Sequence, residues 1–499
     1  MRIRNRGLAT AAGLHLRLSA CAVMVTGLLL SDDPTPLYSA APTRPAAHVY
    51  RPALIEGVPH VRQKPDFCGE ACGEMMLGKL GVKLTQDDVF NYSGLDPAEG
   101  RGCYTRELDR GLKAIGFTTG DVWHRVDPSK GEQELESHFA ALHADLRAGT
   151  ANIVCMHYDA SPTASEHFRL VLGYDPKTDE VIYHEPAIER GSYQRMPKSL
   201  FLELWPLKYS EQAWTVIRLR LDPGKLVERP KAQPSGSVFT DADYARHIHR
   251  LKQQLPSKDF VTFLERPFVV IGDEPAATVE RRSKNTVRWA VEHLKQSYFA
   301  SDPATIIDIW LFKDRESYET NAEQLFDAKP TTPYGYYSPS HRALVMNIST
   351  GGGTLVHEIV HPFIGANFSD CPAWFNEGLA SLYEQCGEEQ GRIHGYPNWR
   401  LPSLRQAIKA DRVPSFETLC ATTPQEFYQQ DRGTNYAQAR YLCYYLQERG
   451  LLEKFYREFV KAAAKDPTGL ETLKSVLGVD DLDAFKKDWE AFVLKVKYE

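Results

Sequence analysis

Between residues 49 and 222 the hydrophobic positions change from helical spacing to strand-like runs. The stretches GEACGEMMLGKLG, directly after Cys68, and YTRELDRGLKAIG have helical patterns, and each ends at a glycine, a common closing signal of a helix. The later runs ANIVCMHY, FRLVLGY, EVIYHE and WTVIRLRL are short and apolar, and turn residues such as DPKTD separate them. Helices followed by strands predict an α+β domain over 49–222.

A second α+β pattern occupies residues 241–499. Strand-like PFVVIGD is followed by a long helical pattern, ATVERRSKNTVRWAVEHLKQSYF, and by the strand-like runs TIIDIWLF and RALVMNIS. A helix-rich region then extends from YAQARYLCYYLQERG to the end of the chain. Between the two patterns, Pro, Gly and charged residues replace the periodic hydrophobics, which predicts a linker at 223–240. A chain of 499 residues is also too long for one ordinary core, so two domains are expected.

The amino-terminal segment, 1–48, differs from both patterns. A basic start, MRIRNR, precedes the apolar run Leu18–Leu30, and a stretch rich in Pro, Ala, Ser and Thr follows. This order is typical of a secretory signal, so we expect export to the periplasm, the cell envelope or the medium. An uncleaved membrane anchor is the alternative, and the residues before Cys21 also resemble a lipoprotein box, so membrane association stays open.

Charge and cysteine content narrow the functional classes. The net charge is −6, the pI is near 6.3, and charges of both signs are interspersed, so there is no basic field for nucleic acid. The chain has nine cysteines. If it is exported, the pairs Cys371/Cys386 and Cys420/Cys443 are the expected disulfides, although connectivity does not follow from sequence. The oligomeric state is not predicted.

The stretch GGGTLVHEIVHPFIGANFSDCPAWFNEGLASLYE, residues 351–384, indicates a metal site. His357 and His361 are four residues apart, so a helix presents both imidazoles on one face, where they can bind one Zn²⁺. Glu377 on the following helix is the expected third ligand, which leaves one coordination position for water. Glu358 is then placed to take a proton from that water. The alternative is a solvated helix face with two core histidines.

These residues resemble the gluzincins, the thermolysin-like and aminopeptidase-like zinc peptidases. WFNEGLASLYE is very similar to the aminopeptidase segment that carries the third ligand. The resemblance implies a thermolysin-like fold, with His357, His361 and Glu377 as zinc ligands and Glu358 as the general base. It also implies an oxyanion-stabilising tyrosine, for which Tyr436 is the candidate and Tyr428 the second. No Gly-x-Met-x-Asn motif precedes the helix, which argues against exopeptidase action.

The run RALVMNIST, before the metal site, suggests how a substrate is held. We expect it to form an edge strand, on which an extended peptide can be laid by strand addition. This expectation favours a peptide substrate.

The first pattern has a cysteine site of its own. Cys68 starts a predicted helix, where the positive end of the helix dipole should lower the thiol pKa. His167 at the head of one strand and Glu185 at the end of the next could meet at one edge of a hairpin, as base and orienting group. Gln63 could donate its amide to a developing oxyanion. The alternatives for Cys68 are a disulfide or an inert buried thiol.

This second arrangement resembles the papain-like double-glycine leader peptidases and their stand-alone relatives, the C39-like cysteine peptidases. A glutamine, then Cys-Gly and a helix, and later a strand that starts at a histidine and ends in Gly-Tyr-Asp carry the likeness over about 55–222. It implies a papain-like fold, with Cys68 as nucleophile, His167 as base and Gln63 as oxyanion donor. Glu185 stands where the family usually has aspartate, and the spacing from Gln63 to Cys68 is one residue short.

Three hypotheses follow from these patterns. The first is an exported peptidase with a zinc site and a Cys/His/Glu site, acting on peptides or proteins. The second keeps the zinc peptidase but treats the cysteine domain as a non-catalytic peptide-binding module. The third is a structural component of the cell envelope with neither activity, and the joint presence of His357, Glu358, His361 and Glu377 argues against it.

Overall fold

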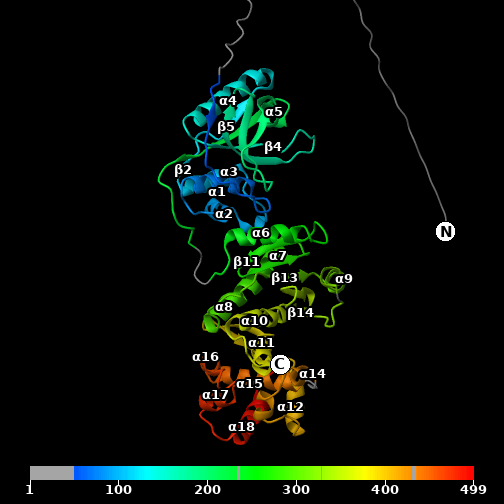
Figure 1. Ribbon diagram of the computed structural model, residues 1–499. Helices are drawn as coiled ribbons and strands as arrows, with labels where there is room; N and C mark the ends of the chain where they lie inside the picture. Colours follow the sequence, from blue (N-terminus) through cyan, green and yellow to red (C-terminus); the bar gives the residue numbers. More distant parts are fainter. Residues whose placement is uncertain (1–49, 233–236, 328, 430–433, 499) are drawn as a thin grey trace, which may run out of the picture. The chain divides into compact units, whose positions relative to one another are not determined.

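A computed structural model describes residues 50–232, 237–327, 329–429 and 434–498 (Figure 1). The signal, anchor and lipoprotein-box predictions fall on 1–48, outside the described residues. Residues 50–499 form one compact unit. None of the described helices is both long and apolar enough to cross a bilayer.

The part of the chain before residue 224 contains an antiparallel sheet and the helices that pack on it. Its elements are β1 (Ala53–Leu54), α1 (Cys68–Lys79), α2 (Gln86–Ser93), η1 (Pro97–Glu99), α3 (Thr105–Ile115), β2 (Phe117–Thr118), β3 (Trp123–Val126), η2 (Pro128–Lys130), α4 (Gly131–Arg147), β4 (Asn152–His157), β5 (Glu166–Asp175), β6 (Glu180–His184), β7 (Gln194–Pro197), α5 (Lys198–Leu204), β8 (Leu207–Ser210), β9 (Ala213–Arg220) and β10 (Asp222–Pro223).

The predicted helices and strands of this part are confirmed. The two glycine-terminated helical patterns form α1 and α3, and the four apolar runs form β4, β5, β6 and β9. The main sheet has the order β3-β9-β4-β5-β6-β7, with β1 on β5 and β8 on β9. Strand β5 is buried on both faces over most of its length, which explains its continuous apolar run instead of an alternating one. The strand also carries the site residue His167 near its start.

The following elements comprise a smaller mixed sheet and the helices and hairpin next to it. They are α6 (Asp241–Lys252), β11 (Val261–Glu265), β12 (Phe268–Gly272), α7 (Ala276–Arg282), η3 (Ser283–Arg288), α8 (Trp289–Ser297), β13 (Ile307–Phe312), α9 (Arg315–Phe326), β14 (Gly335–Ser338), β15 (Ala343–Asn347), η4 (Ile348–Thr350), α10 (Gly353–Asn367), α11 (Ala373–Leu382), β16 (Cys386–Glu389) and β17 (Arg392–Gly395). The sheet order is β11-β12-β13-β15-β14, and the strand pairs β12–β13 and β13–β15 are parallel.

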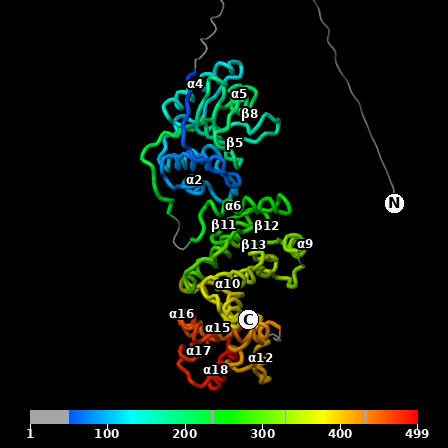
Figure 2. Tube along the Cα trace, in the orientation of Figure 1, coloured from blue at the N-terminus to red at the C-terminus, as the bar shows by residue number. Residues whose placement is uncertain are grey.

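Helices make up the rest of the chain, as the sequence predicts (Figure 2). They are α12 (Leu401–Lys409), α13 (Phe416–Cys420), α14 (Pro424–Gln429), α15 (Asn435–Glu448), α16 (Leu452–Ala462), α17 (Leu470–Leu477) and α18 (Leu482–Lys495). A single hydrophobic core joins these helices to α10, α11 and one face of the mixed sheet. These helices therefore pack against and support α10 and α11, which carry the predicted metal ligands.

The contact α11–α15 depends on a glycine beside the predicted third ligand. A Cβ on Gly378 would lie 3.0 Å from the carbonyl oxygen of Ala439 and 3.0 Å from Cys443 Sγ. The fully buried guanidinium of Arg440 donates to the carbonyl oxygens of Ser381 and Leu382 at the end of α11. These contacts fix α11, and Glu377 with it, against α15.

Helix α6 contributes to two cores. Its Ala242 and Ala245 pack into the core of the first sheet, while Tyr244 and Ile248 pack with β12, β13 and α9. The α6 amino terminus has a capping box, in which the Thr240 hydroxyl and the Asp243 carboxylate bond to each other's backbone N–H. The predicted start of the second domain at 241 thus coincides with a helix that also contacts the first sheet's core.

Candidate functional site

Helices α10 and α11 bring together the three predicted metal ligands. One ligand atom from each of His357, His361 and Glu377 lies within 4.8 Å of the others. Glu377 Oε2 is 3.4 Å from His357 Nε2, and Glu377 Oε1 is 3.9 Å from His361 Nε2. His357 and Glu377 are 8% and 5% exposed, so little solvent reaches them. The i,i+4 spacing and the next helix place these groups as expected.

The second ring nitrogen of each histidine faces a further polar group. His361 Nδ1 donates to Asn376 Oδ1 over 2.9 Å, and His357 Nδ1 lies 3.5 Å from Glu384 Oε1. Partners of this kind orient a histidine so that its Nε2 is available to a metal. The sequence analysis missed Asn376 and Glu384. Glu384 lies two residues beyond the end of α11, so helical spacing alone does not indicate its position beside His357.

Glu384 is itself fixed by cationic and amide donors. Arg400 donates to both of its oxygens, over 2.6 and 2.9 Å, and Asn398 donates to Oε2 over 2.9 Å. The backbone at Glu384 also lies very close to the backbone at Gly353. A Cβ on Gly353 would lie 2.0 Å from the Glu384 carbonyl oxygen. The glycine at the start of α10 therefore permits the contact that sets Glu384 beside His357.

The electrostatics of the trio suit a divalent cation. Burial opposes the ionisation of Glu377, but the contact with His357 and the charges of both histidines lower its pKa to about 2. Burial likewise opposes protonation of His357, yet Glu377 and neighbouring carboxylates raise its pKa to about 9. Glu377 Oε2 is buried without a hydrogen-bond partner among the described residues. An ionised carboxylate with one unpartnered oxygen among the described residues, close to two histidine side chains, fits a zinc ligand set.

A cavity of about 720 Å³ opens beside the trio. Glu358, the predicted base, lines it together with His357, and burial raises the pKa of Glu358. Of the two candidate tyrosines, Tyr436 lines this cavity, whereas the Tyr428 hydroxyl donates to Glu377 Oε1 over 2.8 Å. The structure thus gives the two tyrosines different positions: one faces the cavity and the other holds the carboxylate.

The edge-strand prediction is wrong. The run RALVMNIST forms β15, which lies between β13 and β14 and is paired on both sides. The edge is β14, the short stretch GYYS, whose Gly335 lines the metal cavity. Strand β14 has only four residues, one of them a glycine, so its hydrophobic pattern is too weak to predict a strand. The loop before it gives no indication of its pairing with β15.

Cys68 is the first residue of α1, as predicted, and it is partly exposed. It lines a cavity of about 700 Å³. The expected lowering of its pKa is wrong: burial raises the pKa of Cys68 to about 12, although a backbone hydrogen bond at Phe168 acts in the opposite direction. Burial raises the pKa of Cys68 more than the helix dipole lowers it, so the side chain is a protonated thiol at neutral pH.

His167 and Glu185 form the predicted pair. His167 Nε2 is hydrogen-bonded to Glu185 Oε1, and Arg169 Nε donates to Glu185 Oε2 over 2.7 Å. All three are buried. Burial opposes ionisation of Glu185, but the bonds and charges of His167 and Arg169 lower its pKa. The sequence analysis missed Arg169, which shares the face of β5 with His167 because it lies two residues later.

Gln63 lies in the loop between β1 and α1, close to the Glu185 turn. Its backbone N–H donates to the Pro186 carbonyl over 2.8 Å, and its Oε1 is buried without a hydrogen-bond partner among the described residues. Within 50–232 as described, no hydrogen bond joins Cys68 to His167. On β5 the neighbours Glu166 and Phe168 line the Cys68 cavity, whereas His167 is not among its lining residues.

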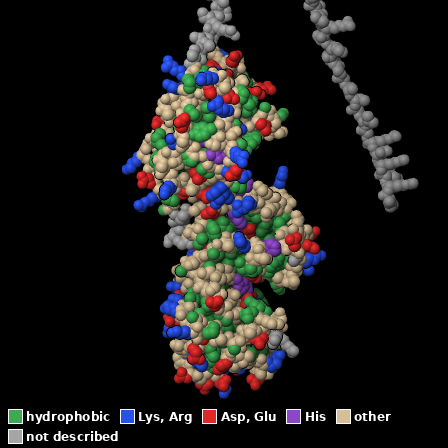
Figure 3. Space-filling model, in the orientation of Figure 1, with side chains coloured by type: hydrophobic (Ala, Val, Ile, Leu, Met, Phe, Trp, Pro, Cys, Tyr) green, Lys and Arg blue, Asp and Glu red, His purple; other side chains and the backbone are tan. Residues whose placement is uncertain are grey.

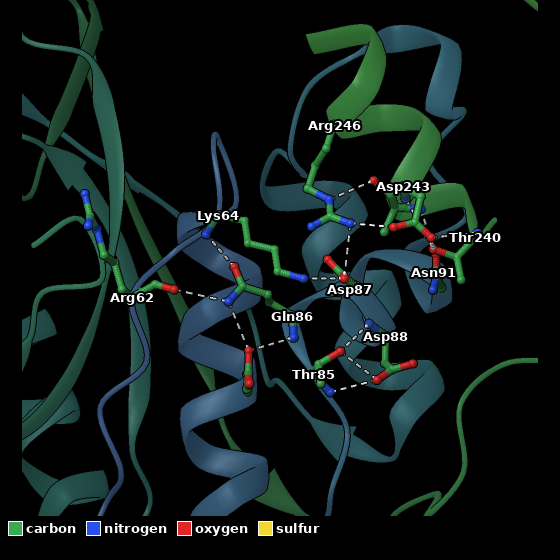
Figure 4. Close-up of polar contacts among 12 residues, drawn as sticks. Arg62, Lys64, Thr85, Gln86, Asp87, Asp88, Asn91, Thr240, Asp243 and Arg246 are labelled. Carbon is green, nitrogen blue, oxygen red and sulfur yellow. Dashed lines mark hydrogen bonds and ion pairs between the residues drawn. The ribbon is translucent and has the colours of Figure 1, made fainter. Parts of the chain in front are cut away.

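The loop before Cys68 is tied to α2. The side chain of Gln86 accepts the N–H of Lys64 over 2.7 Å and donates to the carbonyl of Arg62 over 3.2 Å, so it clamps both neighbours of Gln63 (Figure 4). Gln86 also donates to Glu74 of α1 over 3.1 Å. One buried amide thereby connects the loop of the candidate oxyanion donor to two helices.

A carboxylate on α2 extends this connection to α6. Asp87 Oδ2 pairs with Lys64 Nζ and lies 3.4 Å from an Arg246 nitrogen, and that nitrogen also donates to Asp243 over 2.6 Å (Figure 4). Asn91 Oδ1 accepts the N–H of Ala242 over 2.9 Å. The contacts of α6 therefore reach the loop that leads to Cys68.

The disulfide prediction is wrong. The eight cysteines that the structure describes are all free thiols, including Cys371, Cys386, Cys420 and Cys443. Cys420 and Cys443 are buried in the apolar core, where a thiol packs as a small hydrophobic group.

Charged side chains of both signs are mixed on the visible surface. On the face shown in Figure 3, Lys and Arg side chains lie among Asp and Glu side chains.

Comparison with known families bears on the cysteine site. Residues 55–213 match the model of the Peptidase_C39 like family. The matched region contains Gln63, Cys68, His167 and Glu185, and it supports a peptidase that acts on peptides or proteins. The match ends before the mixed sheet and does not include His357, His361 or Glu377. No curated protein matches the chain.

Proposed function

We propose that the protein is an exported peptidase with two sites: a thermolysin-like zinc site around His357, His361 and Glu377, and a papain-like cysteine site around Cys68. The convergence of the three ligand atoms within 4.8 Å carries the proposal. The family match over 55–213 supports the second site. Export rests on the segment 1–48 alone and stays a prediction.

At the zinc site the protein supplies ligands, a base and charge stabilisation. His357, His361 and Glu377 would hold Zn²⁺, which supplies Lewis acidity toward water and the substrate carbonyl. Glu358 takes the proton of the attacking water and passes it to the leaving amine, and its raised pKa makes it a stronger base for the first of these transfers. The Tyr436 hydroxyl donates to the oxyanion, since it lines the same cavity.

At the cysteine site the Cys68 sulfur attacks the scissile carbonyl while His167 accepts the thiol proton. Glu185 holds His167 through Nε2, which leaves Nδ1 for that proton. Gln63 donates its side-chain amide to the oxyanion. Because burial keeps Cys68 protonated, proton transfer must accompany attack.

The decisive experiment combines metal analysis with peptide hydrolysis by the full chain. We expect one zinc per chain, and Glu358→Gln should keep the zinc and lose hydrolysis by about 100-fold or more. Glu319→Gln, an exposed carboxylate on α9, is the matched control and should change nothing. Protein purified without added chelator that contains no zinc, and binds none on titration, would refute the metal site.

A second candidate function treats the first part as a non-catalytic peptide-binding module. The high pKa of Cys68 and the missing hydrogen bond to His167 favour it. A thiol probe distinguishes the two: a nucleophile reacts faster in the wild type than in His167→Ala at neutral pH, whereas an inert thiol reacts equally slowly in both. Cleavage that persists in chelator and disappears in Cys68→Ala would establish the cysteine peptidase.

A further inference from the structure

Exposed aromatic side chains gather in the cavity that Cys68 lines. Tyr104, Trp123 and Tyr209 are 64%, 48% and 63% exposed, and all three line this cavity of about 700 Å³. Buried Phe168 also contributes to its wall. Aromatic rings left in water within one concave site are a mark of a ligand-binding surface rather than of a core.

The three rings reach the cavity from separate parts of the chain. Tyr104 immediately precedes α3, Trp123 begins β3, and Tyr209 lies on β8. Strands β3 and β8 both pair with β9, which brings Trp123 and Tyr209 to the same sheet region. Nothing in local sequence periodicity requires three exposed aromatics to converge. Their common position next to a cysteine therefore points to a shared ligand.

Two of the rings are held in place before any ligand arrives. The Arg101 guanidinium lies 3.8 Å from the centre of the Tyr104 ring, which covers one face of the ring. Burial and a hydrogen bond with Glu166 raise the pKa of Tyr209, so its hydroxyl is engaged. Rings that are already fixed lose little entropy when a ligand stacks on them.

We propose that this cavity binds a bulky apolar side chain, aromatic above all, of a peptide at a residue adjoining the scissile bond. A glycine at that residue would leave the cavity unfilled and its rings in water. The lining carboxylates Asp66 and Glu166 face a single lining cation, Arg106, so an acidic peptide side chain is disfavoured there. The inference rests on the proposed cysteine site for its substrate but not for the binding itself.

The test separates binding from catalysis by using the full chain with Cys68→Ala. Two fluorescently labelled peptides are identical except for Phe or Gly at the two residues before the intended scissile bond. Each is titrated with the protein, and binding is measured by fluorescence polarisation. We expect the Phe peptide to bind at least about tenfold more tightly, because its rings bury apolar area against the aromatic side chains of the cavity. A Glu peptide should bind no better than the Gly peptide.

Variants then locate the binding. Trp123→Ala and Tyr209→Ala should weaken the Phe peptide about tenfold and leave the Gly peptide within twofold. Tyr498→Ala, at an exposed tyrosine outside the cavity, is the matched control and should change neither. Equal affinity for the Phe and Gly peptides, or a Phe preference that survives both cavity variants, would overturn the inference. Preferential Phe binding without thiol-dependent cleavage would instead refute the cysteine peptidase and leave the binding site standing.

Discussion

A buried carboxylate near the cysteine site should make the first core lose stability as the pH rises. Glu70, in the first turn of α1, is fully buried. Its Oε1 accepts the N–H of Cys103 over 2.7 Å, and its Oε2 has no hydrogen-bond partner among the described residues. Burial raises the pKa of Glu70 from 4.5 to about 7, although the Cys103 hydrogen bond acts in the opposite direction.

The sign and size of the effect follow from proton linkage. Between pH 4.5 and about 7 the unfolded chain has released the Glu70 proton, while the folded chain still holds it. Stability is therefore fully present below pH 4.5 and falls as the pH rises toward 7. At about 1.4 kcal/mol per pH unit, this difference of about 2.5 pH units removes at most about 3.5 kcal/mol from the free energy of unfolding.

Glu70→Gln tests this reasoning, because glutamine keeps the shape and the acceptor oxygen but does not ionise. We expect the wild type to be less stable at pH 8 than at pH 5 by up to about 3 kcal/mol, and the variant to lose most of that dependence. The readout is the alkylation rate of Cys72, a fully buried thiol two residues after Glu70 in α1, compared between the two proteins at each pH in mild urea.

A matched control isolates burial as the cause. Glu132→Gln removes an exposed carboxylate of α4 and should leave the pH dependence of Cys72 alkylation unchanged. If wild type and Glu70→Gln show the same ratio of alkylation rates at pH 5 and pH 8, Glu70 is not a proton-linked group and the argument fails.

Other substitutions test the packing around the two sites. Asp87→Ala removes the carboxylate shared by α6 and the loop before the nucleophile, and should lower thiol-dependent turnover without changing zinc content, as kinetics and metal analysis would show. Glu384→Gln should weaken zinc affinity about 10- to 100-fold in a competition with a chelator, since it loses the charged partner of His357, and unchanged affinity would contradict this. Gly353→Ala should disrupt the metal site because its Cβ has no space, whereas Gly365→Ala, on the same helix with open space, should stabilise the fold by up to about 1 kcal/mol in thermal unfolding.

Features set by local spacing could be predicted from the sequence. The helix that starts at Cys68, the strand that carries His167 and the α10 helix with His357 and His361 depend on periodicity within about one element, and the structure has them where expected. Glu377 was also placed correctly, because only one short connection separates its helix from α10.

Tertiary contacts decided what the sequence could not. The edge strand is β14 because pairing order depends on distant strands, and the Cys68 thiol stays protonated because burial, a property of the whole core, exceeds the local dipole. The contacts of Arg169 and Glu384 follow only from the folded structure. Arg169 contacts Glu185, the partner of His167, and Glu384 lies beside His357. Local periodicity determines whether a segment forms a helix or a strand and which face it buries. Strand pairing, the burial of ionisable groups and the hydrogen bonds that orient site residues arise between segments that are far apart in the sequence.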